Sequence, residues 1–171
     1  MLVRKLGVVA IAAALLVGTA GCSLTSNVAT KKVYAPSDGA QADLGSIHAR
    51  NVLALSDGTH AQIIGSLVND GETDQSVSLT VTSGATAAET TFEVKAKSKV
   101  DFGYPAALGY VGSQPAIELT GVLPAVGSNI EVVLDNNPDA TLHVQVLDGT
   151  IPTYADLMPY LNDATATPAA K

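Results

Sequence analysis

The chain has 171 residues, a formal net charge of −7 at pH 7 and a single cysteine. An acidic chain argues against a nucleic-acid partner and against electrostatic adhesion to anionic lipid headgroups. With one cysteine no intramolecular disulfide can form, so packing must supply the stability of the fold. The sequence contains no Trp and only 4% aromatic residues, which predicts a core of Val, Leu, Ile and Ala. The length fits one domain.

The N-terminal residues have the three parts of an export signal. Arg4 and Lys5 supply positive charge, and Leu6 to Val17 form an apolar run. Residues 19–21 (Thr-Ala-Gly) are small enough to enter a signal peptidase site. The run is too short for a permanent transmembrane helix, which needs about 20 apolar residues. We therefore expect residues 1–21 to be a signal peptide.

The only cysteine, Cys22, directly follows this segment. Ala20-Gly21-Cys22 resembles the end of a bacterial lipobox, Leu-(Ala/Ser)-(Gly/Ala)-Cys, with Thr19 where Leu is commonest. The resemblance implies cleavage between Gly21 and Cys22, diacylglycerol on the Cys22 sulfur and acylation of the new amine, for example by palmitate. Two acyl chains anchor a protein stably, whereas one does so marginally. We expect a lipoprotein on the extracytoplasmic face of the cell membrane; an ordinary secretory signal with an incidental cysteine is the alternative.

Three further segments are expected after the signal. Residues 22–43 comprise the lipidated cysteine and a polar, small-residue stretch without periodicity, which indicates a flexible tether. Residues 44–160 carry the alternating pattern of a β domain. Residues 161–171 are small and are expected to be a disordered tail.

Apolar and polar residues alternate through residues 44–160. Between Gln75 and Thr82, Val77, Leu79 and Val81 alternate with Ser and Thr. The same period recurs, in clean or weaker form, in seven other segments: 47–55, 61–68, 91–97, 99–104, 116–120, 129–134 and 141–146. Gly, Asn, Asp and Pro separate them. Seven or eight short strands of this kind predict an all-β fold, an antiparallel immunoglobulin-like β-sandwich. Near the end of the domain, Thr153 is a candidate N-cap for a short helical turn.

Few residues suggest metal chemistry. The histidines are His48, His60 and His143, without a His-x-His or carboxylate–histidine spacing. We expect His48 and His143 to point to solvent without partners, and we predict no metal site and no cofactor. Asp135 to Asp139 is oxygen-rich, but it lacks the ligand pattern of a calcium loop and contains Pro138, so an ordinary turn is favoured.

No pattern of an activated nucleophile appears either. There is no Gly-x-Ser-x-Gly turn and no cysteine besides the expected anchor, so we predict that the protein is not an enzyme. Gly103 to Gly112, with Tyr104 and Tyr110, is the least strand-like internal stretch. The two tyrosines either line a ligand groove or cap the end of the sandwich; capping is favoured because loop tyrosines often cover apolar core.

Two family resemblances follow from these residues. The anchor, the strand pattern and the closing segment Val146 to Pro159 (Val-Leu-Asp-Gly-Thr-Ile-Pro-Thr-Tyr-Ala-Asp-Leu-Met-Pro) resemble small actinobacterial envelope lipoproteins of the LpqE type. More loosely, residues 116–134 are similar to the second half of periplasmic copper chaperones of the PCu(A)C fold. In that alignment Ala116 and Glu118 occupy the positions of the His-x-Met ligand pair, so the resemblance implies a shared fold without the copper site.

The sequence thus favours a non-catalytic binding or scaffolding module of the cell envelope, held to the membrane by its lipid anchor. The expected partner is an envelope protein or glycolipid, not a nucleic acid. The alternative is a metal-binding or metal-delivery protein related to the copper chaperones, which would require His48, His60 and His143 to converge in space.

Overall fold

The computed structural model describes residues 37–161 apart from 85, 111 and 122. The expected signal peptide, Gly21, Cys22, most of the expected tether and the expected tail apart from Leu161 lie outside the described residues. Leu161 is buried against the domain. Within the described part, no helix has the length and apolar character needed to cross a membrane.

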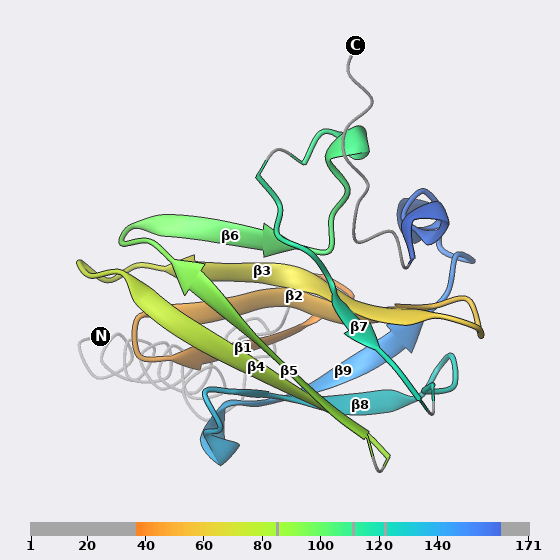
Figure 1. Ribbon diagram of the computed structural model, residues 1–171, viewed down its shortest axis with the longest axis horizontal. Helices are drawn as coiled ribbons and strands as arrows, with labels where there is room; N and C mark the ends of the chain where they lie inside the picture. Colours follow the sequence, from red (N-terminus) through yellow and green to blue (C-terminus); the bar gives the residue numbers. More distant parts are fainter. Residues whose placement is uncertain (1–36, 85, 111, 122, 162–171) are drawn as a thin grey trace, which may run out of the picture. The chain divides into compact units, whose positions relative to one another are not determined.

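The described part of the chain is all-β, with nine strands and four short helical turns (Figure 1). The strands are β1 (Ala40–Leu44), β2 (Ile47–Ser56), β3 (Ala61–Asn69), β4 (Gln75–Ser83), β5 (Thr86–Val94), β6 (Ser98–Phe102), β7 (Ile117–Leu119), β8 (Asn129–Leu134) and β9 (Thr141–Leu147). The helical turns are η2 (Ala106–Leu108), η3 (Pro138–Ala140), α2 (Pro152–Ala155) and η4 (Met158–Tyr160).

All nine strands belong to one hydrogen-bonded sheet. The order is β5-β4-β8-β9-β2-β3-β6, with β1 added to β2 and β7 added to β3. Every pairing is antiparallel except β2 with β9, which is parallel and places Ala54 opposite Val146. The prediction of a purely antiparallel arrangement is therefore wrong at this pair. Alternation along a strand fixes which face is buried, but it carries no information about the direction of the neighbouring strand.

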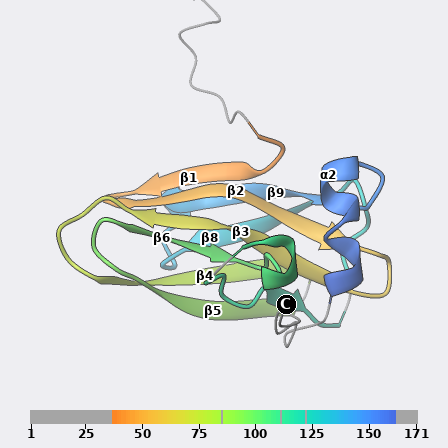
Figure 2. The same cartoon turned by 90° about the horizontal axis from the view of Figure 1, so that it is seen from above.

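The sheet curls until its two end strands approach each other (Figure 2). β5 packs beside β6 and β7 without pairing with either. Inside this opening the rings of Phe92 and Phe102 lie 4.9 Å apart, tilted by 33°. Side chains, rather than backbone hydrogen bonds, therefore close the sheet into a nearly barrel-like form.

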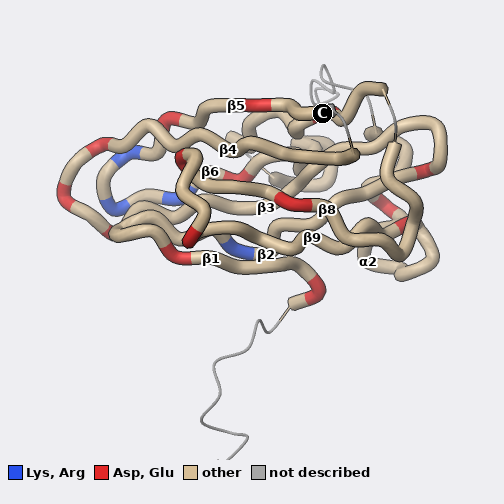
Figure 3. The backbone as a smooth tube through the Cα atoms, turned by 90° about the horizontal axis from the view of Figure 1, so that it is seen from below, with Lys and Arg blue, Asp and Glu red and all other residues tan. Residues whose placement is uncertain are grey.

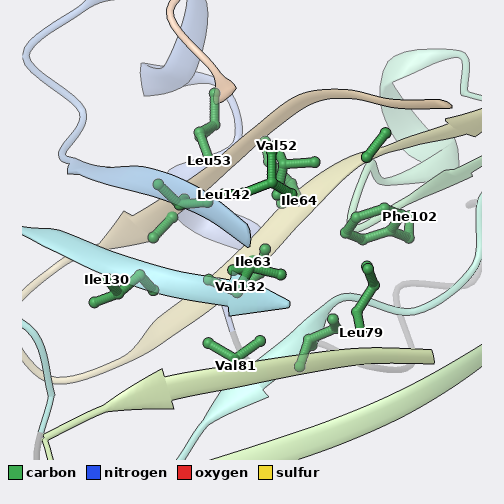
Figure 4. Close-up of a cluster of buried hydrophobic side chains, with 14 of the residues drawn as sticks. Val52, Leu53, Ile63, Ile64, Leu79, Val81, Phe102, Ile130, Val132 and Leu142 are labelled. Atoms are coloured by element: carbon green, nitrogen blue, oxygen red, sulfur yellow. The ribbon is translucent and has the colours of Figure 1, made fainter. Parts of the chain in front are cut away.

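The core lies inside this curl, where inward side chains from opposite sides of the sheet meet (Figure 4). Val52 and Leu53 of β2 and Ile63 and Ile64 of β3 are fully buried, and Phe102 is among the largest fully buried side chains. Aliphatic residues dominate the core, as the composition predicts: Leu79, Val81, Ile130, Val132 and Leu142 complete the cluster.

All eight expected strand segments form strands, and the ninth strand is β1. Residues 40–43 of β1 were expected to belong to the tether, because the alternation of Ala with Gln and Asp is short and its apolar side chains are small. β5 begins five residues before the expected segment 91–97 and ends at Val94. The prediction for Thr153 is also wrong: α2 starts at Pro152 after Ile151, and no side chain caps it.

Candidate functional site

The structure brings Tyr104 and Tyr110 together in the loop that follows β6 (Figure 1). Their ring centroids lie 4.7 Å apart and the ring planes differ by 29°, which is a stacked pair. Gly103 allows this turn because its φ is +75°, and a Cβ there would meet Ile64 at 2.5 Å. The backbone N–H of Gly103 donates to the carbonyl of Gln114 at 2.9 Å, which closes the base of the loop.

The two tyrosines have different surroundings. Tyr104 is half-buried and packs against the core, whereas Tyr110 is 42% exposed. Leu108, in η2 of the same loop, is 41% exposed. Tyr104 thus covers the core, as in the capping arrangement, while Tyr110 and Leu108 are exposed on the same loop. We call Tyr104, Leu108 and Tyr110 the tyrosine surface.

Asn51 holds Tyr104 in place from β2. Its side-chain amide donates to the Tyr104 hydroxyl at 3.2 Å, and its Oδ1 accepts the backbone N–H of Gly39 at 3.1 Å. Burial raises the pKa of Tyr104. Asn51 itself has a φ of +49° and lies where the β2–β3 register shifts. Sequence reasoning missed this residue, because an isolated Asn within a strand pattern gives no signal of its role.

A third tyrosine, Tyr154, joins the end of the domain to its beginning. Its ring is buried in α2, and its hydroxyl donates to Asp38 Oδ2 at 3.0 Å. Burial is the main cause that raises the pKa of Tyr154 to about 12, with the hydrogen bond to Asp38 adding to it. The segment before β1 is therefore tied to the closing helix, at the same end of the domain as η2 (Figure 2).

His48 does not match the expectation of a solvent-directed, unpartnered side chain. It is half-buried, and its Nδ1 lies 2.7 Å from Asp43 Oδ1 while its Nε2 lies 3.0 Å from Asp70 Oδ2. These hydrogen bonds, to Asp70 first and to Asp43, raise the pKa of His48. The alternation of residues correctly predicts that His48 lies on an outward face. It does not predict the partners of His48, because Asp43 on β1 and Asp70 after β3 reach the ring only when these segments fold against β2.

The register of the sheet places His48 and His60 too far apart to share a site with His143. His48 is near the start of β2, and His60 follows the other end of the β2–β3 hairpin, about 25 Å away at 3.3 Å per residue. His60 contacts Asp57 at 3.1 Å, and His143 is exposed on β9. In residues 37–161 as described, no group of three or more His, Cys, Asp or Glu could hold a metal ion.

The oxygen-rich segment Asp135 to Asp139 acts as a turn. Asp135 Oδ1 accepts the backbone N–H of Ser78 at 2.7 Å, and Asn136 Oδ1 accepts the Thr80 hydroxyl at 3.2 Å. Asn137 caps η3 by accepting the N–H of Asp139. These side-chain oxygens join the β8–β9 connection to β4 or stabilise the turn itself, which agrees with the turn chemistry that the sequence favoured.

A groove of about 480 Å³ lies at the end of the domain where β4 turns into β5. The residues around it are Thr82 to Gly84 at the end of β4, Leu123 and Pro124, and Ser128 to Glu131. Thr82 and Glu131 are exposed, whereas Ser83 and Ile130 are buried, so their side chains point to opposite faces of the sheet. Its volume falls within the range of small-molecule sites. Sequence reasoning missed this groove because it joins the β4–β5 turn to the segment before β8, more than thirty residues along the chain.

The charges of the described residues are unevenly distributed (Figure 3). Each of the basic side chains in the described part pairs with a carboxylate: Arg50 with Asp43, Lys95 with Asp74, Lys97 with Glu72 and Lys99 with Asp101. The lysines cluster where β5 turns into β6, at the opposite end of β5 from the groove. None of the four described lysine and arginine residues borders the groove.

Comparison with known proteins places this chain in no family. No protein-family model matches the sequence, and a search of curated proteins finds no match.

Proposed function

We propose that this protein is a lipid-anchored binding or scaffolding module of the cell envelope. The observation that carries the proposal is the export-signal pattern that ends in Ala20-Gly21-Cys22. A protein anchored through Cys22 would present its β domain at the extracytoplasmic face of the membrane, on a tether that ends before β1. The resemblance to LpqE-type envelope lipoproteins supports the same assignment.

We further propose that the domain is of the immunoglobulin-like sandwich type. In this description β5, β4, β8 and β9 form one layer, and β1, β2, β3, β6 and β7 form the other, with β2 and β9 joining the layers. The strand order and the face-to-face packing of the inward aliphatic residues support it.

The tyrosine surface is the contact area that best fits a non-catalytic role. Tyr110 and Leu108 are exposed, and Tyr104, which stacks on Tyr110, is held by Asn51. Tyrosine contributes a large, stiff contact area with a polar tip, which suits protein and glycan partners. The acidic character of the domain disfavours adhesion to anionic headgroups. An envelope protein or a glycolipid is therefore the proposed partner.

The test is a crosslinking pull-down of the full-length protein from its native membrane. We expect a specific envelope component with the wild type, and its loss with Cys22→Ala, because the unanchored protein leaves the membrane. Tyr110→Ser should reduce recovery by at least about fivefold, as expected when an aromatic contact residue is truncated. Val126→Ser is the matched control, since Val126 is also exposed but lies outside the tyrosine surface.

Two results would contradict this proposal. One is recovery of membrane background alone from the wild type. The other is a hydrolase or transferase activity in the purified protein, which would make the domain catalytic. The metal-delivery alternative required three converging histidines, and since the hairpin separates His48 from His60, we do not propose it.

A further inference from the structure

The long strand β2 contains a β-bulge at Asn51. Its pairing with β1 passes from Ala49 directly to Val52, and its pairing with β3 shifts between Arg50 and Leu53, so that neither pairing includes Asn51. The φ of Asn51 is +49°. A bulge interrupts the ladder of backbone hydrogen bonds and changes the direction of a side chain, and bulges are common beside functional sites. The bulge therefore gives the Asn51 side chain a direction that regular alternation would not give it.

Asn51 uses this direction to connect two segments that are distant in sequence. We call residues 37–39, which precede β1, the entry segment. The backbone N–H of Gly39 donates to Asn51 Oδ1 at 3.1 Å, and Asn51 Nδ2 donates to the Tyr104 hydroxyl at 3.2 Å. Tyr104 in turn stacks on Tyr110. One amide side chain therefore contacts the entry segment with its oxygen and the tyrosine surface with its nitrogen.

The contact between the entry segment and Asn51 requires glycine at position 39. Gly39 is buried, and a Cβ there would lie 2.6 Å from Asn51 Oδ1, which is too close for any side chain. A second hydrogen bond holds the segment, since the Tyr154 hydroxyl donates to Asp38 Oδ2 at 3.0 Å. Ser37 and Asp38 themselves are exposed. Two hydrogen bonds and one close fit thus seat the entry segment on the domain.

We propose that the entry segment acts as a strap that orders the tyrosine surface through Asn51. While Gly39 is seated, its N–H fixes Asn51 Oδ1, and this turns Nδ2 toward Tyr104. When the segment leaves, the amide loses this fixed orientation, and the Tyr104–Tyr110 stack loses a support. Coupling between two sites is reciprocal, so a partner bound to the tyrosine surface would hold the strap in place. As regulation of partner binding this inference rests on the proposed function, whereas the ordering of the surface does not.

Hydrogen–deuterium exchange of the full-length protein tests the ordering directly. In η2 the N–H of Leu108 donates to the carbonyl of Pro105 at 3.0 Å, and that of Gly109 donates to the carbonyl of Ala106 at 2.9 Å. Their exchange therefore reports local opening of the loop that carries the tyrosines. Gly39→Ala should accelerate exchange in residues 104–109 at least about threefold, while exchange in β8 stays at the wild-type rate.

Gly71→Ala is the matched control for crowding. A Cβ at Gly71 would lie 2.8 Å from Ser46 Oγ, but this residue belongs to the turn between β3 and β4 and does not contact Asn51. We expect it to leave exchange in residues 104–109 unchanged. An effect of Gly39→Ala that the control does not share belongs to the entry segment.

A double-mutant cycle shows whether the effect passes through Asn51. Tyr104→Phe keeps the ring but removes the hydroxyl that Asn51 contacts. In this background Gly39→Ala should accelerate exchange in residues 104–109 by less than about 1.5-fold, because the connection is already broken. A general loosening of the domain would act equally in both backgrounds. If Gly39→Ala does not fold, Tyr154→Phe replaces it in the same cycle, since this variant removes only the hydroxyl that holds Asp38.

Two results would overturn the proposal. One is exchange in residues 104–109 at the wild-type rate after the entry segment is released. The other is acceleration in the Tyr104→Phe background as large as in the wild-type background. Because neither readout uses a partner, a pull-down that recovers only membrane background would reject the proposed function and leave the strap intact.

Discussion

His48 is the residue whose surroundings make the domain sensitive to pH. A carboxylate lies at each ring nitrogen, Asp70 at Nε2 and Asp43 at Nδ1. Both contacts favour the imidazolium form and raise the pKa of His48 above its usual value of about 6.5. Asp43 belongs to β1 and Asp70 follows β3, so the protonated ring joins elements on both sides of β2.

We predict that the domain loses stability as the pH rises through the folded-state pKa of His48. Since that pKa is raised on folding, its contribution is fully present below about pH 6.5 and is lost above the folded-state value. The loss should be no more than about 1 kcal/mol, because Asp43 and Asp70 are largely exposed to solvent. Urea denaturation of the wild type and His48→Gln at pH 5.5 and pH 8.5 measures it.

The variant serves as the control for this prediction. His48→Gln keeps a polar side chain but cannot carry the charge, so the stability difference between wild type and variant should shrink at the higher pH. A difference that is equal at both pH values would show that the two carboxylates do not act through the charge of His48. Asp43 has a lowered pKa, mainly from its hydrogen bond to His48, and its own contribution is lost only as the pH falls through that lowered value.

Asn51 combines an unusual backbone conformation with two side-chain hydrogen bonds. Its φ of +49° is tolerated by Asn but costs about 1–2 kcal/mol in a residue such as Ala. We predict that Asn51→Ala lowers the free energy of unfolding by about 2–3 kcal/mol, because the lost hydrogen bonds to Gly39 and Tyr104 add to the strain. Asn51→Gly should lower the free energy of unfolding by only about 1 kcal/mol, because Gly adopts this φ without strain and only the hydrogen bonds are lost. Equal losses in urea denaturation would refute the backbone contribution.

At the scale of the element, β5 is an edge strand that its own charges protect. It has nine residues and pairs only with β4. Two of its exposed side chains are carboxylates, Glu89 and Glu93, and charged residues on edge strands discourage pairing between molecules. We predict that the double variant Glu89→Thr, Glu93→Thr aggregates at protein concentrations where the wild type stays monomeric, while folding to the same structure.

Size-exclusion chromatography with light scattering, together with circular dichroism, measures this effect. Ser76→Thr, Thr82→Ser is a control on β4, which is paired on both sides. Aggregation of that control to the same extent would mean that the edge of β5 is not the cause. A monomeric double variant would show that the packing of β6 and β7 beside β5 prevents pairing between molecules without the two carboxylates.

The elements show how far the sequence alone could lead. Alternation identifies β4, β8 and β9 almost to their ends, because each has one buried and one exposed face. The pattern is weaker in β2 and β3, because residues 52–56 and 61–65 are buried on both faces. β1 is not predicted, because its small and polar residues, Ala-Gln-Ala-Asp, have a weak preference for strand and depend on pairing with β2. The first half of β5, Thr-Ala-Ala-Glu, is likewise extended by its pairing with β4. Intrinsic preference is too weak to predict strands that depend on a neighbour.

The candidate sites were predicted less completely than the strands. Tyr104 and Tyr110 were found because tyrosines in a glycine-rich loop stand out in an aromatic-poor chain. The groove and the contacts of His48 depend on pairings between distant segments, such as Glu131 with Thr82 and His48 with Asp70. These encounters depend on which strands pair, and the alternation within one strand does not show which distant strand is its partner.

At the scale of the whole molecule, the closure of the sheet rests on a few large side chains. β5 has no backbone partner on its outer edge in the described part, so the Phe92–Phe102 ring pair spans the opening. Phe102 is fully buried, and Gly65 on β3 makes room for it: a Cβ on Gly65 would lie 2.9 Å from the ring. The approach of β5 to the opposite layer therefore depends on the contact between the Phe92 and Phe102 rings and on the absence of a side chain at Gly65.

We predict that Phe102→Leu destabilises the domain and loosens β5 selectively. The loss of ring volume and of the aromatic contact should lower the free energy of unfolding by about 1–3 kcal/mol. Because β5 keeps its pairing with β4 but loses its packing across the opening, hydrogen–deuterium exchange should accelerate more in β5 than in β8. Leu142→Ala is the matched control: it also removes buried apolar volume, but from β9, away from the opening. If both variants accelerate exchange in β5 equally, relative to β8, then the ring pair does not close the sheet, and the two layers are held by the joining strands β2 and β9 alone.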